Sequence, residues 1–205
     1  SKSKGNVVSP DDLVRDYGCD SLRMYELFVG PPELDAEWDD RGIDGVNRFL
    51  KRLWNMLMES KEKDIQPTKE MIKLRHRMVY DITTRLESFS LNTVISGFME
   101  YNNKFIEVAK KEGGIDKETL ETIAVLLSPF APHFAEEMWE QLGHVDTVFK
   151  AGWPKYDENE MKDDEIKIPV QINGKTKAVI EIPADISKDD AIAAGREAIA
   201  DKLTG

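Results

Sequence analysis

The stretch GVNRFLKRLWNML, at residues 45–57, decides the fold class. Its apolar side chains recur at intervals of three and four residues, which is the spacing of one face of an α-helix. They are Val46, Phe49, Leu50, Leu53, Trp54 and Leu57. The stretch therefore predicts a long amphipathic helix that buries one face against neighbouring elements.

The same helical period continues towards the C-terminus. Apolar residues repeat with it over residues 72–89, 91–106, 116–127 and 132–142, and Ser, Gly or Pro residues interrupt the chain between these ranges. We therefore expect residues 43–153 to form a helical bundle and the chain to be mainly α. Residues 1–42, which contain an opening loop and shorter helical stretches, form a separate region in this interpretation.

Residues 166–205 have a different pattern, because the period changes from helical to alternating. The apolar members of the first alternating stretch are Ile166, Ile168, Val170 and Ile172. Asn173-Gly174 follows as a hairpin signal. A simple two-residue loop would place Lys175 and Lys177 on the apolar face, so we predict a three-residue loop with Gly174 left-handed and a β-bulge. A helix capped by Ser187 then completes a small α+β domain, which looks incomplete because a hairpin and one helix bury little surface.

An acidic linker is expected between the bundle and this tail, at residues 154–165. Within it, residues 157–165 (DENEMKDDE) carry six acids and one lysine. A run of like charges is typical of a solvated segment.

Composition and charge exclude several functions. The chain of 205 residues has one cysteine and three histidines, so we expect neither a disulfide framework nor a metal site. No apolar run reaches membrane-spanning length, so no membrane contact is expected. The formal net charge of −11 disfavours nucleic acid over most of the surface. An RNA-binding function therefore requires the basic residues to gather on one side.

The first residues, SKSKGNVVSP, have the composition of a phosphate-handling loop. Lys2 is a mobile cation suited to a phosphate oxygen, and Ser1 and Ser3 can donate hydroxyl groups. Gly5 lets backbone N–H groups approach an anion closely. Taken alone, this signal is weak, because Lys- and Ser-rich chain starts are common and usually solvated.

Residues 1–25, SKSKGNVVSPDDLVRDYGCDSLRMY, resemble the signature loop of class I aminoacyl-tRNA synthetases and the segment after it. Ser1, Lys2 and Ser3 match the last three positions of the family's Lys-Met-Ser-Lys-Ser motif, whose first two residues are absent here. Two further stretches are similar to the leucyl-tRNA synthetases. They are residues 25–54, YELFVGPPELDAEWDDRGIDGVNRFLKRLW, and residues 170–192, VQINGKTKAVIEIPADISKDDAI. The resemblance covers essentially the whole chain.

The resemblance implies the C-terminal, tRNA-binding part of a leucyl-tRNA synthetase that begins inside the catalytic loop. The parent enzyme of this family is a leucine–tRNA ligase, which activates leucine with ATP and Mg2+ and transfers it to tRNA-Leu. Ser1, Lys2 and Ser3 would contact ATP, and Lys2 would be catalytic by stabilising charge on the departing pyrophosphate. The resemblance also implies a cytoplasmic monomer. Without the nucleotide-binding half and the editing domain, we expect the chain alone to be inactive and to bind no cofactor.

Candidate tRNA contacts follow from local charge. Lys69, Lys73 and Arg77 share one predicted helix face, and Arg48 and Arg52 lie one turn apart on another helix. These residues predict a basic stripe that contacts the RNA backbone. A solvated helix face with acids nearby is an equal alternative.

In the tail, Lys175 and Lys177 lie near the tip of the predicted hairpin. The family's C-terminal domain touches the corner of the tRNA, so both lysines are candidate contacts. The alternative is that they only keep the hairpin soluble. His133, at a predicted helix start, is interpreted as a structural or capping residue, because nothing nearby in the sequence completes a catalytic site.

Two other interpretations of the whole chain remain open. The first is a valyl-, isoleucyl- or methionyl-type synthetase with the same bundle, against which Trp38 and the Asn173-Gly174-Lys175 hairpin argue. The second is a free-standing acidic helical module that binds proteins. The net charge favours the second slightly, but it leaves the opening loop unexplained.

Overall fold

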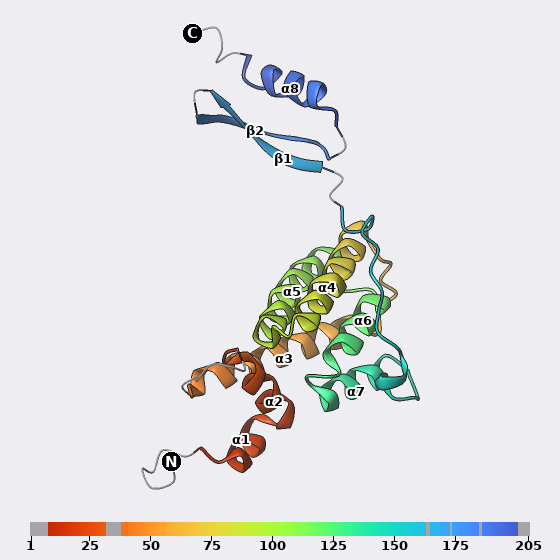
Figure 1. Cartoon of the computed structure of the whole chain (residues 1–205). Coiled ribbons are helices and arrows are strands. Elements are labelled where there is room, and N and C mark those ends of the chain that lie inside the picture. Colours follow the sequence, from red (N-terminus) through yellow and green to blue (C-terminus); the bar gives the residue numbers. More distant parts are fainter. Residues whose placement is uncertain (1–7, 32–37, 163–164, 173, 185, 201–205) are drawn as a thin grey trace. The chain divides into compact units, whose positions relative to one another are not determined.

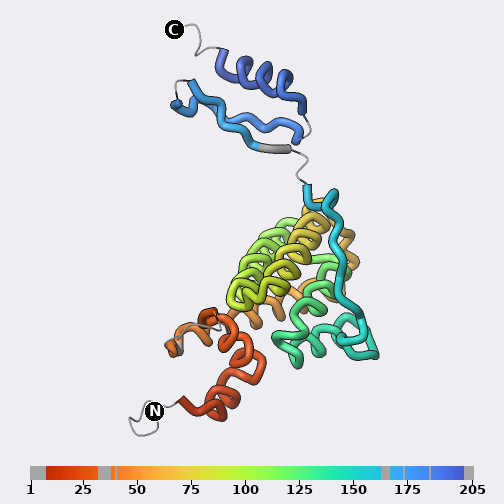
Figure 2. The backbone as a smooth tube through the Cα atoms, viewed as in Figure 1, coloured from red at the N-terminus to blue at the C-terminus, as the bar shows by residue number. Residues whose placement is uncertain are grey.

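The computed structural model describes residues 8–31, 38–162, 165–172, 174–184 and 186–200. The chain divides into two compact units, Ser1–Glu160 and Met161–Gly205, and each is described by itself. Figures 1 and 2 show a helical first unit, and a second unit made of a hairpin and a helix. The expected mainly α fold with a small α+β part at its end is confirmed.

The described part of the first unit consists of α-helices and one 3₁₀ turn. They are α1 (Pro10–Tyr17), α2 (Cys19–Phe28), α3 (Asp40–Ser60), α4 (Lys69–Glu87), α5 (Leu91–Glu112), α6 (Lys117–Leu127), α7 (Pro132–Gln141) and η2 (Val148–Lys150). The long helices α4 and α5 run side by side (Figure 1). None of the helices described is both long and apolar enough to cross a membrane.

Helix α3 buries the face that its sequence predicts. Five residues of its apolar stripe are buried, and Trp54 is half-buried. This face meets side chains from the other long helices, among them the fully buried Phe105 of α5 and Met78 of α4. The stretch at residues 45–57 therefore supplies one wall of the main core.

Polar side chains begin several of these helices. Asp39 accepts a hydrogen bond from the backbone N–H of Arg41 at the start of α3, and Thr68 accepts one from Met71 at the start of α4. Each of these bonds satisfies a backbone donor that the first turn of a helix leaves without a partner. The starts of α3 and α4 are therefore encoded locally.

The end of α4 differs from the sequence-based expectation. The apolar repeat predicted that Phe89 packs in the core, but α4 ends at Glu87 and Phe89 is 65% exposed. Its φ of 56° lies in the left-handed region, which turns the chain towards α5. The apolar repeat extends beyond the end of the helix, because the spacing of apolar residues carries no information about the turn.

An ion pair in the core joins α4 to the start of α6. Arg75 Nη1 lies 3.3 Å from Asp116 Oδ1 and 3.0 Å from Glu118 Oε2. Asp116 also caps α6, because it accepts hydrogen bonds from the backbone N–H and the hydroxyl of Thr119, at 3.0 and 2.6 Å. Arg75 and Asp116 are both buried, so each charge depends on the other for its solvation.

One buried amide lacks a partner. Asn102 of α5 is buried, and within the described part of the chain its Oδ1 has no hydrogen-bond partner. An unsatisfied buried acceptor costs about 1–3 kcal/mol. Replacement of Asn102 by leucine, which removes this cost, should raise the free energy of unfolding by about 1 kcal/mol in chemical denaturation. The matched change Asn103→Leu, at the exposed neighbouring position, should leave it nearly unchanged; equal effects of the two would contradict the assignment.

The second unit contains β1 (Glu165–Ile172) antiparallel to β2 (Lys175–Pro183), followed by α8 (Lys188–Glu197). Ile168 lies opposite Ile180 and Val170 opposite Ala178, as the predicted bulged register requires. The register shifts next to Val170, and Gly174 has the predicted left-handed φ of 77°.

The predicted loop length was wrong. Ile172 pairs with Lys175, so two residues rather than three separate the strands. The extra residue is Lys177 within β2, since Gln171 pairs with Thr176 and Val170 with Ala178. A bulge inside the strand restores the apolar face as well as a longer loop would.

Helix α8 lies against the apolar face of the hairpin. The hydroxyl of Ser187 accepts from the backbone N–H of Asp190, as predicted for its cap. A Cβ on Gly195 would lie 3.6 Å from Val170 Cγ2, so this glycine lets the helix approach the strand closely. Ile199, just after α8, is buried, whereas Ile192 is 44% exposed.

Candidate nucleic-acid interface

The predicted ATP loop lies outside the described residues. Ser1, Lys2 and Ser3 all fall within residues 1–7, so their role stays a prediction. The other sequence-predicted site residues lie on α3, on α4 and in the hairpin.

Three basic side chains form a stripe on the solvent side of α3. Arg48, Lys51 and Arg52 are all exposed and follow the spacing i, i+3 and i+4, which places them on adjoining turns. No acidic residue occurs between Gly45 and Met58. We call these three side chains the α3 stripe.

The α3 stripe is not neutralised by the described part of the chain. No hydrogen bond or ion pair joins Arg48, Lys51 or Arg52 to another described residue. In a chain with a net charge of −11, this leaves a local positive field at the surface of α3. The sequence analysis predicted Arg48 and Arg52 but missed Lys51, although the acid-free interval around it was visible.

The second predicted set, on α4, lies beside a docked segment. The Trp153 indole N–H donates to Thr83 Oγ1 at 2.9 Å, and the Tyr156 and Tyr80 rings meet edge to face with centroids 5.1 Å apart. The backbone N–H of Asp157 donates to His76 Nδ1 at 3.0 Å. The first residues of the predicted linker therefore lie along α4.

Helix α5 lies on the other side of this set. Lys111 of α5 pairs with Glu70 at 3.2 Å, and the hydroxyl of Tyr101 donates to Asp81 at 2.6 Å. Burial, together with this hydrogen bond, raises the pKa of Tyr101. On a helical wheel, Lys69, Lys73 and Arg77 fall between the side of α4 that faces α5 and the side that contacts the docked segment. We call these three side chains the α4 ridge.

The ridge of α4 is less available to RNA than the α3 stripe. Lys69, Lys73 and Arg77 are each engaged by other groups of the chain, and Lys73 and Arg77 are half-buried. The docked segment also brings acidic residues of the range 157–160 next to α4. The two predicted basic sets therefore differ in how available their cations are to RNA.

The hairpin lysines lie in the second unit. Lys175 and Lys177 are both exposed, Lys175 next to the turn and Lys177 at the bulge. An exposed position suits either of the roles considered for them, so their contact with RNA stays a prediction.

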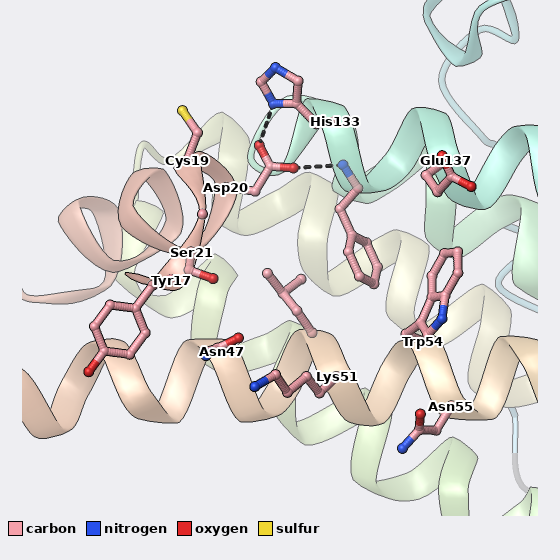
Figure 3. A pocket seen from close by; sticks show the side chains of 13 residues that line it. Tyr17, Cys19, Asp20, Ser21, Asn47, Lys51, Trp54, Asn55, His133 and Glu137 are labelled. Carbon is pink, nitrogen blue, oxygen red and sulfur yellow. Dashed lines mark hydrogen bonds and ion pairs between the residues drawn. The ribbon is translucent and has the colours of Figure 1, made fainter. Parts of the chain in front are cut away.

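A pocket of about 530 Å³ opens beside the α3 stripe, between α2, α3 and α7 (Figure 3). Asp20 of α2 closes one end of it, where one carboxylate oxygen accepts from the backbone N–H of Phe134 at 2.6 Å. The other oxygen lies 2.9 Å from His133 Nδ1. Asp20 therefore caps α7 from another helix, and His133 contacts the same carboxylate.

Aromatic and polar side chains line the rest of the pocket. Trp54 and Phe134 meet edge to face, with ring centroids 5.8 Å apart. Asn47, Lys51 and Asn55 follow each other at intervals of four residues along α3 and border the same space. The sequence analysis missed this pocket, because its walls come from three helices that are distant in the chain.

Comparison with known proteins identifies the class of protein. The sequence pattern of the family described as "Anticodon-binding domain of tRNA ligase" matches residues 68–192. The chain belongs to this family of anticodon-binding domains.

The relatives narrow the assignment to one ligase. The chain is 46% identical to the leucine–tRNA ligase of Fervidobacterium nodosum, over 93% of the chain and 25% of that protein. It is 44% identical to the leucine–tRNA ligase of Thermotoga maritima, with the same two coverages. The chain is thus homologous to leucine–tRNA ligases and corresponds to an anticodon-binding region of that enzyme. It spans about a quarter of the length of these relatives.

A solved structure supports the same assignment. It is the crystal structure of the ternary complex of Agrobacterium radiobacter K84 agnB2 LeuRS-tRNA-LeuAMS, which is 27% identical to the chain. The match covers 96% of this chain and 27% of the chain in the solved structure, with a TM-score of 0.81. These matches favour the leucyl interpretation over the other synthetases and over an unrelated acidic module.

Proposed function

We propose that the chain binds tRNA-Leu as the tRNA-binding part of a leucyl-tRNA synthetase, with the α3 stripe as its main contact to the RNA backbone. The family match and the solved relative, which was crystallised with tRNA, support a tRNA ligand. The observation that carries the choice of surface is the α3 stripe itself. Its three cations have no partner among the described residues, so they can neutralise phosphates without first breaking an ion pair.

The contact proposed is electrostatic rather than base-specific. Phosphate contacts position a protein on nucleic acid and release condensed counterions, which makes the affinity depend steeply on salt. The acidic remainder of the surface repels RNA and so restricts it to one side of α3. Lys69, Lys73 and Arg77, and Lys175 and Lys177, are weaker candidates for further contacts.

The parent enzyme supplies the chemistry in this proposal. In the cytoplasm it activates leucine with ATP and Mg2+, passes it to tRNA-Leu and works as a monomer. Lys2 stabilises the charge that develops on the pyrophosphate, with Ser1 and Ser3 at the same loop. The chain alone forms no leucyl-adenylate, because the pocket that holds the substrates is supplied by the rest of the enzyme.

Filter retention of tRNA-Leu and tRNA-Val across a salt series tests the proposed function. We expect the chain to retain tRNA-Leu at least as strongly as tRNA-Val, because contacts to phosphates do not themselves read the sequence. The logarithm of the affinity should fall with the logarithm of the salt concentration with a slope of about −3, for three phosphate contacts. Retention that is absent, or that does not change with salt, would contradict the proposal.

A further inference from the structure

We propose that the pocket of Figure 3 binds one unstacked nucleotide of the RNA, with the base inside the pocket and its phosphate at Lys51. The proposal rests on the proposed function, because it names a contact within the same RNA complex. It adds a base-binding site to a surface that otherwise offers only contacts to phosphates.

The size and lining of the pocket suit a nucleobase. A volume of about 530 Å³ lies within the range of small-ligand pockets, which are mostly apolar with a few well-placed polar groups. Trp54, Phe134 and Leu50 supply the apolar surface. Aromatic side chains of this kind stack on unpaired bases irrespective of base identity.

Ser21 contributes a hydroxyl group to the wall of the pocket. Ser21 is 2% exposed and lines the pocket, and its side chain has no hydrogen-bond partner among the described residues. Figure 3 shows its oxygen directed into the space between α2 and α3. The oxygen itself is not enclosed by the protein, so it can exchange a hydrogen bond with a polar ligand in the pocket.

Side chains of opposite charge distinguish two sides of the pocket. Lys51 lies on the α3 side, next to Asn47, and has no ion-pair partner in the described part of the chain. Glu137 of α7 lies near Trp54, and within the described part of the chain it accepts one hydrogen bond, from Gln141 Nε2 at 3.0 Å. A phosphate is therefore attracted to Lys51 and repelled from Glu137, which can instead accept an exocyclic N–H of a base.

The neighbouring surface explains why the ligand is part of an RNA. Lys51 belongs both to the pocket and to the α3 stripe, since Arg48 and Arg52 flank it on the same helix. A nucleotide whose phosphate lies at Lys51 therefore places the adjoining phosphates near Arg48 and Arg52. The pocket and the stripe together fit an RNA strand with one base turned out of its stack.

Titration of the chain with nucleoside monophosphates, followed by NMR of the tryptophan indole N–H signals, tests the pocket. We expect AMP, CMP and GMP to shift the Trp54 signal in a saturable manner below roughly 10 mM. The Trp139 and Trp153 signals should stay in place. UMP, which has no exocyclic amine for Glu137, should bind at least about threefold more weakly.

Two matched variants test whether the phosphate of the nucleotide lies at Lys51. Lys51→Met should weaken AMP binding by about three- to tenfold, whereas Lys110→Met, at an exposed lysine of α5, should not change it. Equal affinities of both variants and the original chain would overturn the placement of the phosphate at Lys51.

The two proposals fail in different ways. If tRNA-Leu is retained but no monophosphate shifts Trp54, the pocket proposal is overturned and the proposed function stands. If monophosphates bind but tRNA-Leu does not, the proposed function is overturned and the ligand of the pocket is not part of an RNA. A Trp54 shift with tRNA-Leu as well as with the monophosphates supports both.

Discussion

Replacement of Asp116 by alanine should lower the free energy of unfolding by about 3–5 kcal/mol. The change removes the cap of α6 and leaves the guanidinium of Arg75 buried without the carboxylate that lies 3.3 Å away. The remaining partner of Arg75, Glu118, is largely exposed and cannot replace a carboxylate in the interior. Urea denaturation, with linear extrapolation to water, measures the loss.

Two further variants separate the buried pair from a general effect of losing an acid. Asp146→Ala removes an exposed carboxylate paired with Lys150 at 3.0 Å and should change the stability by less than about 0.5 kcal/mol. The double change Arg75→Met, Asp116→Ala should recover part of the loss, because no unpaired charge stays buried. A loss as small as that of Asp146→Ala would show that the pair does not hold α4 to α6.

Replacement of Arg48, Lys51 and Arg52 together by glutamate should reduce the affinity for tRNA-Leu on the order of 100-fold. Three phosphate contacts are lost and three repulsive charges appear on the same helix. The slope of log affinity against log salt should become shallower by about 2–3, since each contact contributes roughly one unit. Filter retention across the same salt series measures both quantities.

The matched variant carries three glutamates in place of Lys69, Lys73 and Arg77. It makes the same change in net charge, but on the α4 ridge, where other groups of the chain already engage the three cations. We therefore expect a smaller loss of affinity and a smaller change in slope. Circular dichroism should show that both variants keep their helices. A larger loss for the α4 variant would move the proposed interface from α3 to α4.

The sequence predicted those parts of the fold that depend on residues close in the chain. The apolar stripe of α3 and the breaks between helices follow from local spacing, and so did the register of the hairpin. In the hairpin, the need to keep lysine off the apolar face was enough to require a bulge, which displaces Lys177 but leaves Lys175 opposite Ile172. Its position within β2 was not predicted, because a bulge and a longer loop satisfy the same requirement.

The contacts that the sequence did not predict join residues far apart in the chain. Trp153 and Tyr156 dock on α4, although the acidic residues after them suggested a solvated linker from residue 154. Charge composition reports on the solvent preference of a segment, but not on two aromatic rings that find partners on a helix. The pocket escaped prediction for the same reason, since Ser21, Lys51 and Phe134 come from three helices.

The candidate site was predicted only in part. Counting cations along a helix found Arg48 and Arg52 as well as the α4 set, and it ranked them equally. The structure separates them, because the partners of a cation depend on which helices lie beside it. Lys51 was overlooked because it falls three residues after Arg48, between the positions that an interval of four would select.

The carboxylate of Asp20 shows that the segment matched by the family pattern is smaller than the segment that folds. The family pattern begins at residue 68, yet the first turn of α7 receives its cap from Asp20, and α3 provides a wall of the core around Phe105. A piece of the chain cut at residue 68 would leave the Phe134 amide without its acceptor and expose the apolar side of α5. The segment defined by the family pattern and the segment that folds cooperatively therefore have different boundaries, and a minimal folded piece of this chain has to start before Asp20.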